Sequence, residues 1–297
     1  MKLSRFAVDN EESYGIQASE NRILNLPALA KTLNHPFPPT LDALVLQGIS
    51  GLVHARHLVH TANAKEREKV TISQKNVRLL APLLSPPKIV CLGLNYRDHI
   101  REQNAALPDD LIIFMKPRTA VIGPGDTIVK PAFVQQLDYE AELAVIIGRK
   151  GKNISLNNAR HHIFGHTCFN DVSARDIQFR DKQWTRGKSF DTFAPIGPCI
   201  TTTDQMGNPD SLWIRTRVNG ELRQDSSTSN MVFNVYEIMS RLSQVMTLEP
   251  GDIIATGTPA GVGFAMKPEP KFLKSGDVVE IEIENIGTLK NKVTEAG

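Results

Sequence analysis

Three carboxylates at alternate positions are the residues of this chain best suited to chemistry. Asp138, Glu140 and Glu142 precede an apolar run that reaches Ile147. Acidic and apolar residues alternate and then give way to a β-branched run, which predicts a β-strand over 138–147. Because strand side chains alternate between two faces, we expect all three carboxylates on one face. Crowded carboxylates beside a buried run repel one another and lose hydration, and a hard divalent cation relieves both costs. The competing interpretation is a solvated acidic face on an edge strand.

A second acidic segment, Asn170–Asp176, follows an apolar run predicted to be a strand over 163–169. Asp171 sits where this strand gives way to a helix predicted over 174–182, so its carboxylate can point into a pocket. Ser173 and Asp176 have the spacing of a capping box, which is the competing interpretation of the segment.

A histidine and a glutamate three residues apart form a candidate acid–base pair. The segment 97–103 is predicted to be helical, which places His99 and Glu102 on the same helix face. A glutamate that holds an imidazole makes it a better base for activating water near neutral pH. A hydrogen bond on the helix surface is the competing interpretation.

Two further segments can bind an anion. Lys188 follows a glycine in an aromatic setting, and a lysine beside a bound anion can neutralise a developing enolate. The run 255–263 has three glycines and offers backbone N–H groups and the hydroxyl of Thr258. A surface lysine and an irregular turn are the competing interpretations. By contrast, His54, His57 and His60 share a predicted helix face without carboxylate or cysteine partners, so we interpret them as structural.

Composition excludes several classes of protein. Of 297 residues, 41% are hydrophobic and 22% are charged, the profile of an ordinary soluble globular protein. Lysine and arginine total 34 against 32 for aspartate and glutamate, so the net charge predicts no nucleic-acid partner. No apolar run has membrane-spanning length, and Asp9 arrives before a signal peptide could form. Three scattered cysteines without CxxC spacing predict reduced thiols and a cytoplasmic location.

The elements that position these residues divide at the proline-rich connector 85–87. Residues 1–84 predict a small α+β domain, and residues 85–297 predict a strand-dominated domain. Glycine-punctuated short strands favour a closed or folded-over β architecture over a doubly wound sheet. The predicted strands are 3–8, 14–16, 22–26, 88–93, 111–115, 194–200, 212–218 and 278–284, with a hairpin turn at Asn219-Gly220. The remaining predicted helices are 41–45, 52–64 and 232–245.

Eight ordered motifs together resemble the fumarylacetoacetate hydrolase (FAH) family over roughly residues 86–297. They are GLNYRDH, FMKP, DYEAELAV, FNDVSARD, WTRGKSFDTFAPIGP, VNGELRQ, EPGDIIATGTPAGVG and SGDVVEIEIENIGTLKN. The resemblance implies an α+β, β-dominated fold, an FAH-type mixed β-sandwich roll that is usually dimeric. It also implies a divalent cation, Mg²⁺ or Mn²⁺, held by Glu140, Glu142 and Asp171.

Within the family, the chain resembles the acylpyruvase and oxaloacetate decarboxylase branch. The resemblance implies a short lid helix that carries His99 and Glu102 as a catalytic dyad, with Lys188 as a further catalytic group. It assigns substrate contacts to Arg175, Gln178, Lys188, Thr258 and Lys116.

We therefore expect a metal-dependent enzyme that cleaves a C–C bond beside a 2-oxo acid, as an acylpyruvate hydrolase, an oxaloacetate decarboxylase or both. The cation would chelate the 2-oxo and carboxylate oxygens and stabilise the enolate. In hydrolysis His99 would deprotonate the attacking water, whereas decarboxylation needs no water. One alternative is an isomerase or decarboxylase of the 2-hydroxyhepta-2,4-dienedioate type in aromatic catabolism. Another is a non-catalytic member that binds small acids.

Overall fold

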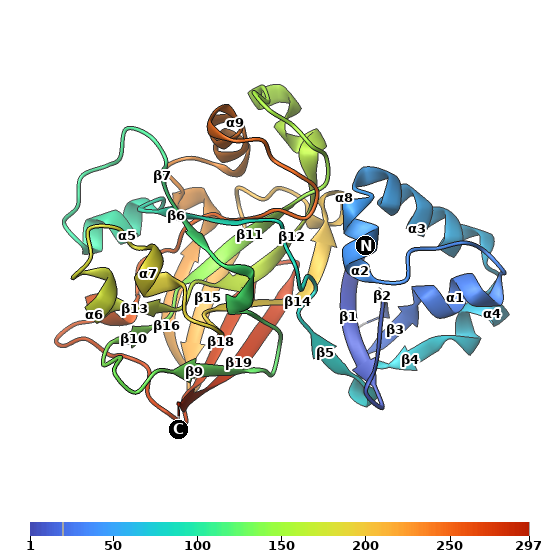
Figure 1. Ribbon diagram of the computed structural model, residues 1–297, viewed down its shortest axis with the longest axis horizontal. Helices are drawn as coiled ribbons and strands as arrows, with labels where there is room; N and C mark the ends of the chain where they lie inside the picture. The colour runs from blue at the N-terminus through green and yellow to red at the C-terminus, as the bar shows by residue number, and fades with distance from the viewer. Residues whose placement is uncertain (20, 297) are drawn as a thin grey trace.

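A large mixed sheet joins the two ends of the molecule. The computed structural model describes residues 1–19 and 21–296. The sheet has the order β4-β3-β2-β1-β14-β12-β11-β17-β6-β7, with β5 added at β1 and β8 at β14. Its strands are β1 (Lys2–Val8), β2 (Glu11–Ser19), β3 (Arg22–Asn25), β4 (Thr71–Ser73), β5 (Arg78–Leu80), β6 (Ile89–Gly93), β7 (Ile112–Lys116), β8 (Val121–Ile122), β11 (Ala141–Ile147), β12 (Ile163–Asn170), β14 (Ala194–Thr202) and β17 (Ile253–Ala255). Figure 1 shows the N-terminal helices on one side and the larger strand-rich body on the other.

The N-terminal region combines the first strands with four helices: α1 (Leu26–Thr32), α2 (Leu41–Leu46), α3 (Ile49–Thr61) and α4 (Ala64–Lys69). Asn25 begins α1 by accepting the N–H of Ala28, as an N-cap residue does. Leucines of these helices share one buried core with strand residues such as Phe169. The predicted strands and helices of this region are confirmed, but β1 pairs antiparallel with β14, so the sheet continues into the rest of the chain. The domain boundary at residue 84 stays a prediction.

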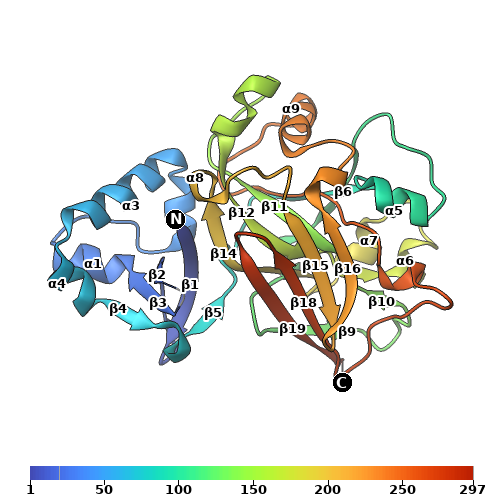
Figure 2. The ribbon, with the colours of Figure 1, turned by 180° about the vertical axis from the view of Figure 1, so that it is seen from behind.

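A second sheet covers the other face of the large one. It has the order β16-β15-β18-β19-β9 and is seen face-on from behind in Figure 2. Its strands are β9 (Thr127–Lys130), β15 (Trp213–Val218), β16 (Glu221–Ser227), β18 (Val278–Ile283) and β19 (Gly287–Glu295). The hairpin turn between β15 and β16 has Asn219 and Gly220 at φ 52° and 82°, as the sequence predicts. Side chains of both sheets share a second core, so the predicted β-dominated sandwich is confirmed.

Strand β11 is buried on both faces, which explains its unbroken apolar run. Leu143 and Val145 point into the core between the sheets, whereas Ala144 and Ile146 point into the core beneath the N-terminal helices. Packed between two cores, β11 is a rigid base for side chains at its N-terminal end. The predicted strand over 138–147 is wrong in one respect, because it is interrupted.

The interruption separates the first carboxylate from the other two. Strand β10 (Leu137–Asp138) pairs with β13 (Ser173–Ala174) in a separate small sheet, and Tyr139 and Glu140 link β10 to β11. The three acids therefore do not line one face of one strand. Alternation in sequence cannot reveal that a strand leaves one sheet for another.

The remaining helices lie around the strand-rich body. They are α5 (Arg97–Glu102), α6 (Arg175–Gln178), α7 (Thr185–Lys188), α8 (Thr203–Met206) and α9 (Val235–Val245). Short 3₁₀ helices occupy Gln74–Asn76, Arg118–Ala120, Leu156–His162, Thr228–Asn230 and Gly263–Ala265. In the described part of the chain, no helix combines the length and apolar character that crossing a bilayer requires.

Candidate active site

The candidate site forms where β11 begins and β12 ends. Antiparallel pairing sets Ala141 opposite Asn170, so the residues before β11 meet those after β12. The N–H of Asp171 donates to the backbone oxygen of Glu140 at 2.9 Å. One carboxylate oxygen from each of Glu140, Glu142 and Asp171 lies within 4.8 Å of the others, and all three residues are buried. The structure thus brings together the three predicted metal ligands.

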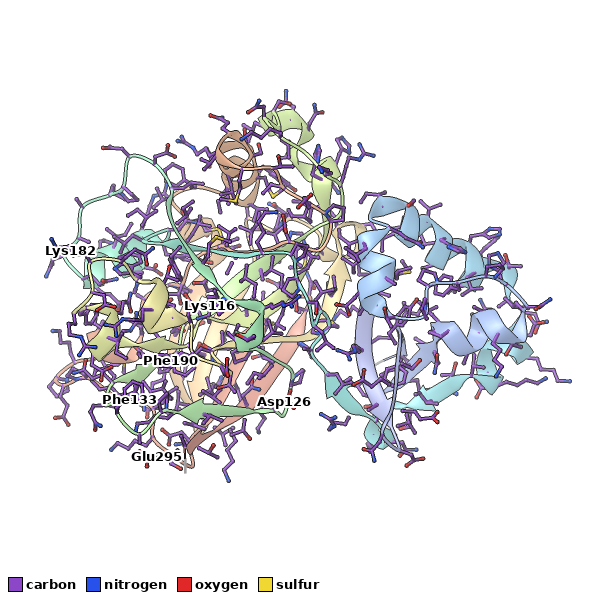
Figure 3. All side chains as sticks on the ribbon, in the orientation of Figure 1. Lys116, Asp126, Phe133, Lys182, Phe190 and Glu295 are labelled. Atoms are coloured by element: carbon purple, nitrogen blue, oxygen red, sulfur yellow. The ribbon has the colours of Figure 1, made fainter. Side chains whose placement is uncertain are left out.

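Glu140, Glu142 and Asp171 together form a cluster of three carboxylates, the carboxylate group of this site. Two buried lysines contact members of this group. Lys188 Nζ donates to Glu140 Oε2 and to Asp171 Oδ2, each at 2.8 Å. Lys116 Nζ donates to Asp171 Oδ1 at 2.5 Å. Figure 3 shows Lys116 inside the strand-rich body, while Lys182 and Phe133 lie at its periphery. Lys188 is 1% exposed, so the interpretation as a surface lysine is wrong.

Glu140 and Glu142 differ in electrostatic environment. Burial raises the pKa of Glu140, but Lys188 and Arg175 outweigh it and lower that pKa to about 2. Burial, together with the charges of Asp171 and Glu140, raises the pKa of Glu142 well above its usual value. Glu142 Oε2 accepts the N–H of Gly257, but Oε1 has no hydrogen-bond partner among the described residues.

Asp138 has a different role from the one its spacing suggests. Its Oδ2 accepts Arg175 Nε at 2.9 Å, and its Oδ1 accepts the N–H of Gly263 at 2.7 Å. The same guanidinium reaches Glu140 Oε1 with Nη1 at 2.7 Å. Asp138 therefore holds Arg175 against the carboxylate group and is not part of the ligand set. Arg175 Nη2 has no partner within the described chain and belongs to a residue that lines the cavity.

These residues fit a hard divalent cation. Four carboxylates (Asp138, Glu140, Glu142 and Asp171) face three cations (Lys116, Arg175 and Lys188). One buried carboxylate is left without compensation, and one of its oxygens is unpaired. The donors are all oxygens, the ligands that Mg²⁺ and Mn²⁺ prefer.

The predicted helix 174–182 is only one turn long, and its capping box is absent. Ser173 Oγ donates to the backbone oxygen of Asp171 at 2.8 Å, and Asp176 accepts the N–H of Gln135. Helix α6 consequently begins without a side-chain cap. Its short turn instead carries Arg175 and Gln178 into the site, where Arg175 Nη1 donates to Gln178 Oε1 at 2.9 Å.

Helix α5 places the predicted dyad over the carboxylate group. His99 Nδ1 lies 2.6 Å from Glu102 Oε1, and Glu102 Oε2 accepts the N–H of Gly261 at 2.9 Å. His99 is 5% exposed, so the pair is not a surface hydrogen bond. Asp98 anchors the helix by accepting Ser226 Oγ at 2.5 Å. The roles assigned to these residues stay predictions.

A narrow cavity of about 80 Å³ is lined by His99 of the dyad and by Glu140 of the carboxylate group. Its polar lining is His99, Gln103, Glu140, Arg175, Gln178, Lys188 and Thr258, and its aromatic lining is Phe114, Phe179, Trp184 and Phe264. Gly93 makes room for Trp184, because a Cβ at Gly93 would lie 2.1 Å from the indole Cζ3. The small volume suits a small acid.

Besides the aromatic walls, two polar residues at or next to the site were not predicted from the sequence. Gln103 contacts His99, and its position four residues later on a predicted helix is a signal that could have identified it. Asn95 donates to the backbone oxygens of Phe233 and Thr256, which fixes the segment before α5. No local signal marks that second contact, because its partners are far away in sequence.

Fold and site together define a class of protein in which a strand-rich roll holds a candidate oxygen-ligand metal centre beside a His–Glu pair. The model of the family described as fumarylacetoacetate (FAA) hydrolase, C-terminal, matches residues 88–294. The chain belongs to the fumarylacetoacetate hydrolase family.

Relatives show the same membership across most of the chain. A mitochondrial protein of Bos taurus named oxaloacetate tautomerase is 45% identical over 273 residues, 91% of this chain and 83% of its own. A fumarylacetoacetate hydrolase from Exiguobacterium antarcticum is 40% identical with a TM-score of 0.83, and both chains are covered completely.

Two other solved relatives bear on chemistry. A maleylpyruvate hydrolase from Sphingobium sp. SYK-6, in complex with manganese(II) and pyruvate, is 30% identical with a TM-score of 0.79 and complete coverage of both chains. A 2-hydroxyhepta-2,4-diene-1,7-dioate isomerase from Mycobacterium marinum is 37% identical with a TM-score of 0.77, covering 100% of this chain and 99% of its own. The cytoplasmic location and the homodimer stay predictions.

Proposed function

We propose that this protein is a Mg²⁺- or Mn²⁺-dependent enzyme that interconverts the enol and keto forms of oxaloacetate or a closely similar 2-oxo acid. The observation that carries the proposal is one narrow cavity lined both by His99, which Glu102 holds, and by Glu140 of the carboxylate group. The name of the bovine relative supports oxaloacetate as the substrate and tautomerisation as the reaction.

Cations of the chain bind and orient the acid. Arg175 lines the cavity and its Nη2 has no partner among the described residues, while Lys188 brings a second positive charge that is 1% exposed. In such a desolvated cavity, charge-assisted hydrogen bonds to a substrate carboxylate are strong. Gln178 and Thr258 add neutral donors to the same lining.

Glu140, Glu142 and Asp171 would hold the divalent cation. When bound, that cation supplies Lewis-acid stabilisation for negative charge on the 2-oxo oxygen, an effect worth several kcal/mol. The unpaired Oε1 of Glu142 supports this assignment, because a buried carboxylate oxygen without a partner is costly.

His99 moves the proton. Glu102 accepts a hydrogen bond from Nδ1–H, so Nε2 is the ring nitrogen left to act on substrate. Glu102 is itself fixed by the N–H of Gly261, which holds the imidazole in one orientation. His99 can take a proton from C3 of the keto form and return it, as general acid–base catalysis requires. Trp184 and Phe264 give the same cavity apolar walls.

The second candidate is C–C bond cleavage, by hydrolysis of an acylpyruvate or by decarboxylation of oxaloacetate. The solved maleylpyruvate hydrolase favours it, since that relative shares the fold and holds manganese and pyruvate. Proton transfer at C3 and loss of CO₂ place negative charge on the same oxygen, so one site can support both. Tautomerisation ranks first because it needs neither a positioned water nor a leaving group.

A side-by-side turnover assay tests the proposal. The purified protein is mixed with oxaloacetate and Mg²⁺ or Mn²⁺, while the enol absorbance and the formation of pyruvate are followed separately. Acetylpyruvate, fumarylpyruvate and 2-hydroxyhepta-2,4-dienedioate are run in parallel. We expect metal-dependent loss of enol absorbance faster than pyruvate appears. Pyruvate formation at the same rate would favour C–C cleavage, and tight oxalate binding without turnover would support a non-catalytic role.

A further inference from the structure

The basic nitrogen of the proposed catalytic histidine is in contact with a glutamine. His99 Nε2 lies 2.6 Å from Gln103 Nε2, on the opposite side of the ring from Glu102. The backbone supports the contact, because the N–H of Gln103 donates to the oxygen of His99 at 3.3 Å. Gln103 is the residue that ends α5, and its side chain lines the cavity.

Hydrogen-bond donors and acceptors determine what this contact means. An ionised Glu102 only accepts, so His99 Nδ1 must carry a hydrogen. Neutral His99 then has a lone pair on Nε2, and the amide N–H of Gln103 satisfies it. If Nε2 gains a proton, it needs an acceptor, and the amide oxygen of the same side chain becomes one after a half-turn of the amide.

We propose that Gln103 is a positioning residue whose amide matches both proton states of His99. The inference rests on the proposed function, because a tautomerase must both remove and return a proton. In the forward step the C3–H bond breaks, its electron pair enters the enolate, and the proton forms the Nε2–H bond. Because Nε2 has a single lone pair, the Gln103 amide gives up its hydrogen bond to Nε2 as the C3 proton arrives. With its oxygen turned toward the ring, the amide then accepts from Nε2–H until the proton is returned. Return of the proton to the substrate restores the first arrangement.

A glutamate or a methionine in place of Gln103 could not bond to Nε2 of His99 in both of its proton states. Gln103→Glu offers an acceptor and favours the ring with both nitrogens protonated. Gln103→Met keeps the length of the side chain but offers no amide, so Nε2 loses its partner in either state. Gln47→Met is the matched control, because Gln47 likewise ends a six-residue helix, α2, but is exposed.

Steady-state kinetics and ring ¹⁵N spectra of histidine-labelled protein with Mg²⁺ test the inference, with a His99→Asn sample to identify the signal. We expect a wild-type proton on Nδ1 with Nε2 unprotonated, and two protonated nitrogens in Gln103→Glu at the same pH. We expect Gln103→Met to lower kcat by about ten- to a hundredfold with KM changed less than about threefold. Gln47→Met should change neither the spectra nor kcat.

Two outcomes would overturn the inference. One is a wild-type ring with its proton on Nε2. The other is a Gln103→Met enzyme with unchanged kcat and raised KM, which would make Gln103 a substrate contact. The spectra require no turnover, so a wild-type protein that does not tautomerise oxaloacetate would reject the proposed function while the spectra still decide the role of Gln103.

Discussion

Two regions of this molecule gather titratable side chains, and only one has the properties of a site. On the N-terminal side, His54 Nε2 lies 3.5 Å from His35 Nδ1, and His57 is a neighbour of the same ring. All three histidines keep contact with solvent. Between β11 and β12, by contrast, Glu140 and Asp171 are almost completely removed from water.

The two groups of side chains differ in burial and in whether their polar atoms have hydrogen-bond partners. Being titratable is not enough to make a site. The histidines stay in contact with solvent, so burying them costs the fold little. Lys116 and Lys188 offset part of the cost of burying the negative charges of the carboxylate group. Even so, Oε1 of Glu142 has no partner among the described residues. A buried group with excess negative charge is where a cation binds favourably.

The largest expected effect separates the regions by activity. Glu142→Gln keeps the shape but removes the uncompensated charge, so we expect kcat/KM to fall by about a hundred- to a thousandfold as metal stabilisation is lost. His57→Gln on α3 should leave kcat/KM unchanged. Turnover and Mn²⁺ titration of both variants provide the measurement. A Glu142→Gln enzyme with full activity would remove the distinction between the two regions.

The free energy of unfolding should distinguish two of the proposed metal ligands, Asp171 and Glu142. Asp171→Ala leaves Lys116 and Lys188 buried without one of their partners, so we expect a loss of about 3–5 kcal/mol in the free energy of unfolding. Glu142→Gln leaves no cation unpaired and should cost much less. Urea unfolding of the metal-free variants measures both values. Equal losses in the two variants would contradict the lysine pairing.

A buried histidine and an exposed one should respond differently to acid. Burial lowers the pKa of His166 from 6.5 to about 4, and both ring nitrogens lack partners among the described residues. The folded state favours neutral His166, so its full contribution is present above pH 6.5 and is lost as pH falls toward 4. We expect a loss of about 2 kcal/mol by pH 5.

His166→Leu should flatten this pH dependence, whereas His57→Leu should not. Unfolding free energies of both variants are compared with those of the original chain across that pH window. An unchanged slope in His166→Leu would show that another group is responsible.

The smallest expected effect concerns metal affinity and pH. Because burial and two neighbouring carboxylates raise the pKa of Glu142, a proton competes with the cation there. Affinity for Mn²⁺ should therefore rise with pH, by at most about tenfold per pH unit below that pKa. Calorimetric titrations from about pH 5 to pH 8 measure it, because the pKa of Glu142 is raised above its usual value of 4.5. Affinity that is constant over this range, with no proton release, would contradict the assignment.

Much of the fold, and the grouping of the three candidate metal ligands, could be predicted from the sequence. Local turn chemistry gave the hairpin at Asn219, and the ordered motifs identified Glu140, Glu142 and Asp171. Periodicity failed at Asp138, because the strand changes sheets after it and its partner Arg175 is 37 residues away. The pairing of Lys188 with two acids is equally non-local, so its burial could not be predicted from its neighbours in sequence.

Gln103 is intermediate between these cases. Its position four residues after His99 on a predicted helix indicates a contact between the two side chains. The role of that contact depends on which ring nitrogen of His99 is bonded to Glu102, and only the folded structure shows that it is Nδ1.

Anomalous scattering from a crystal grown with Mn²⁺ tests the central claim most directly. We predict one strong peak between the three acids, at about 2.1 Å from an oxygen of each of Glu140, Glu142 and Asp171, and none at the histidines of α3. A crystal without a peak there, with those carboxylates turned away from one another, would contradict the account.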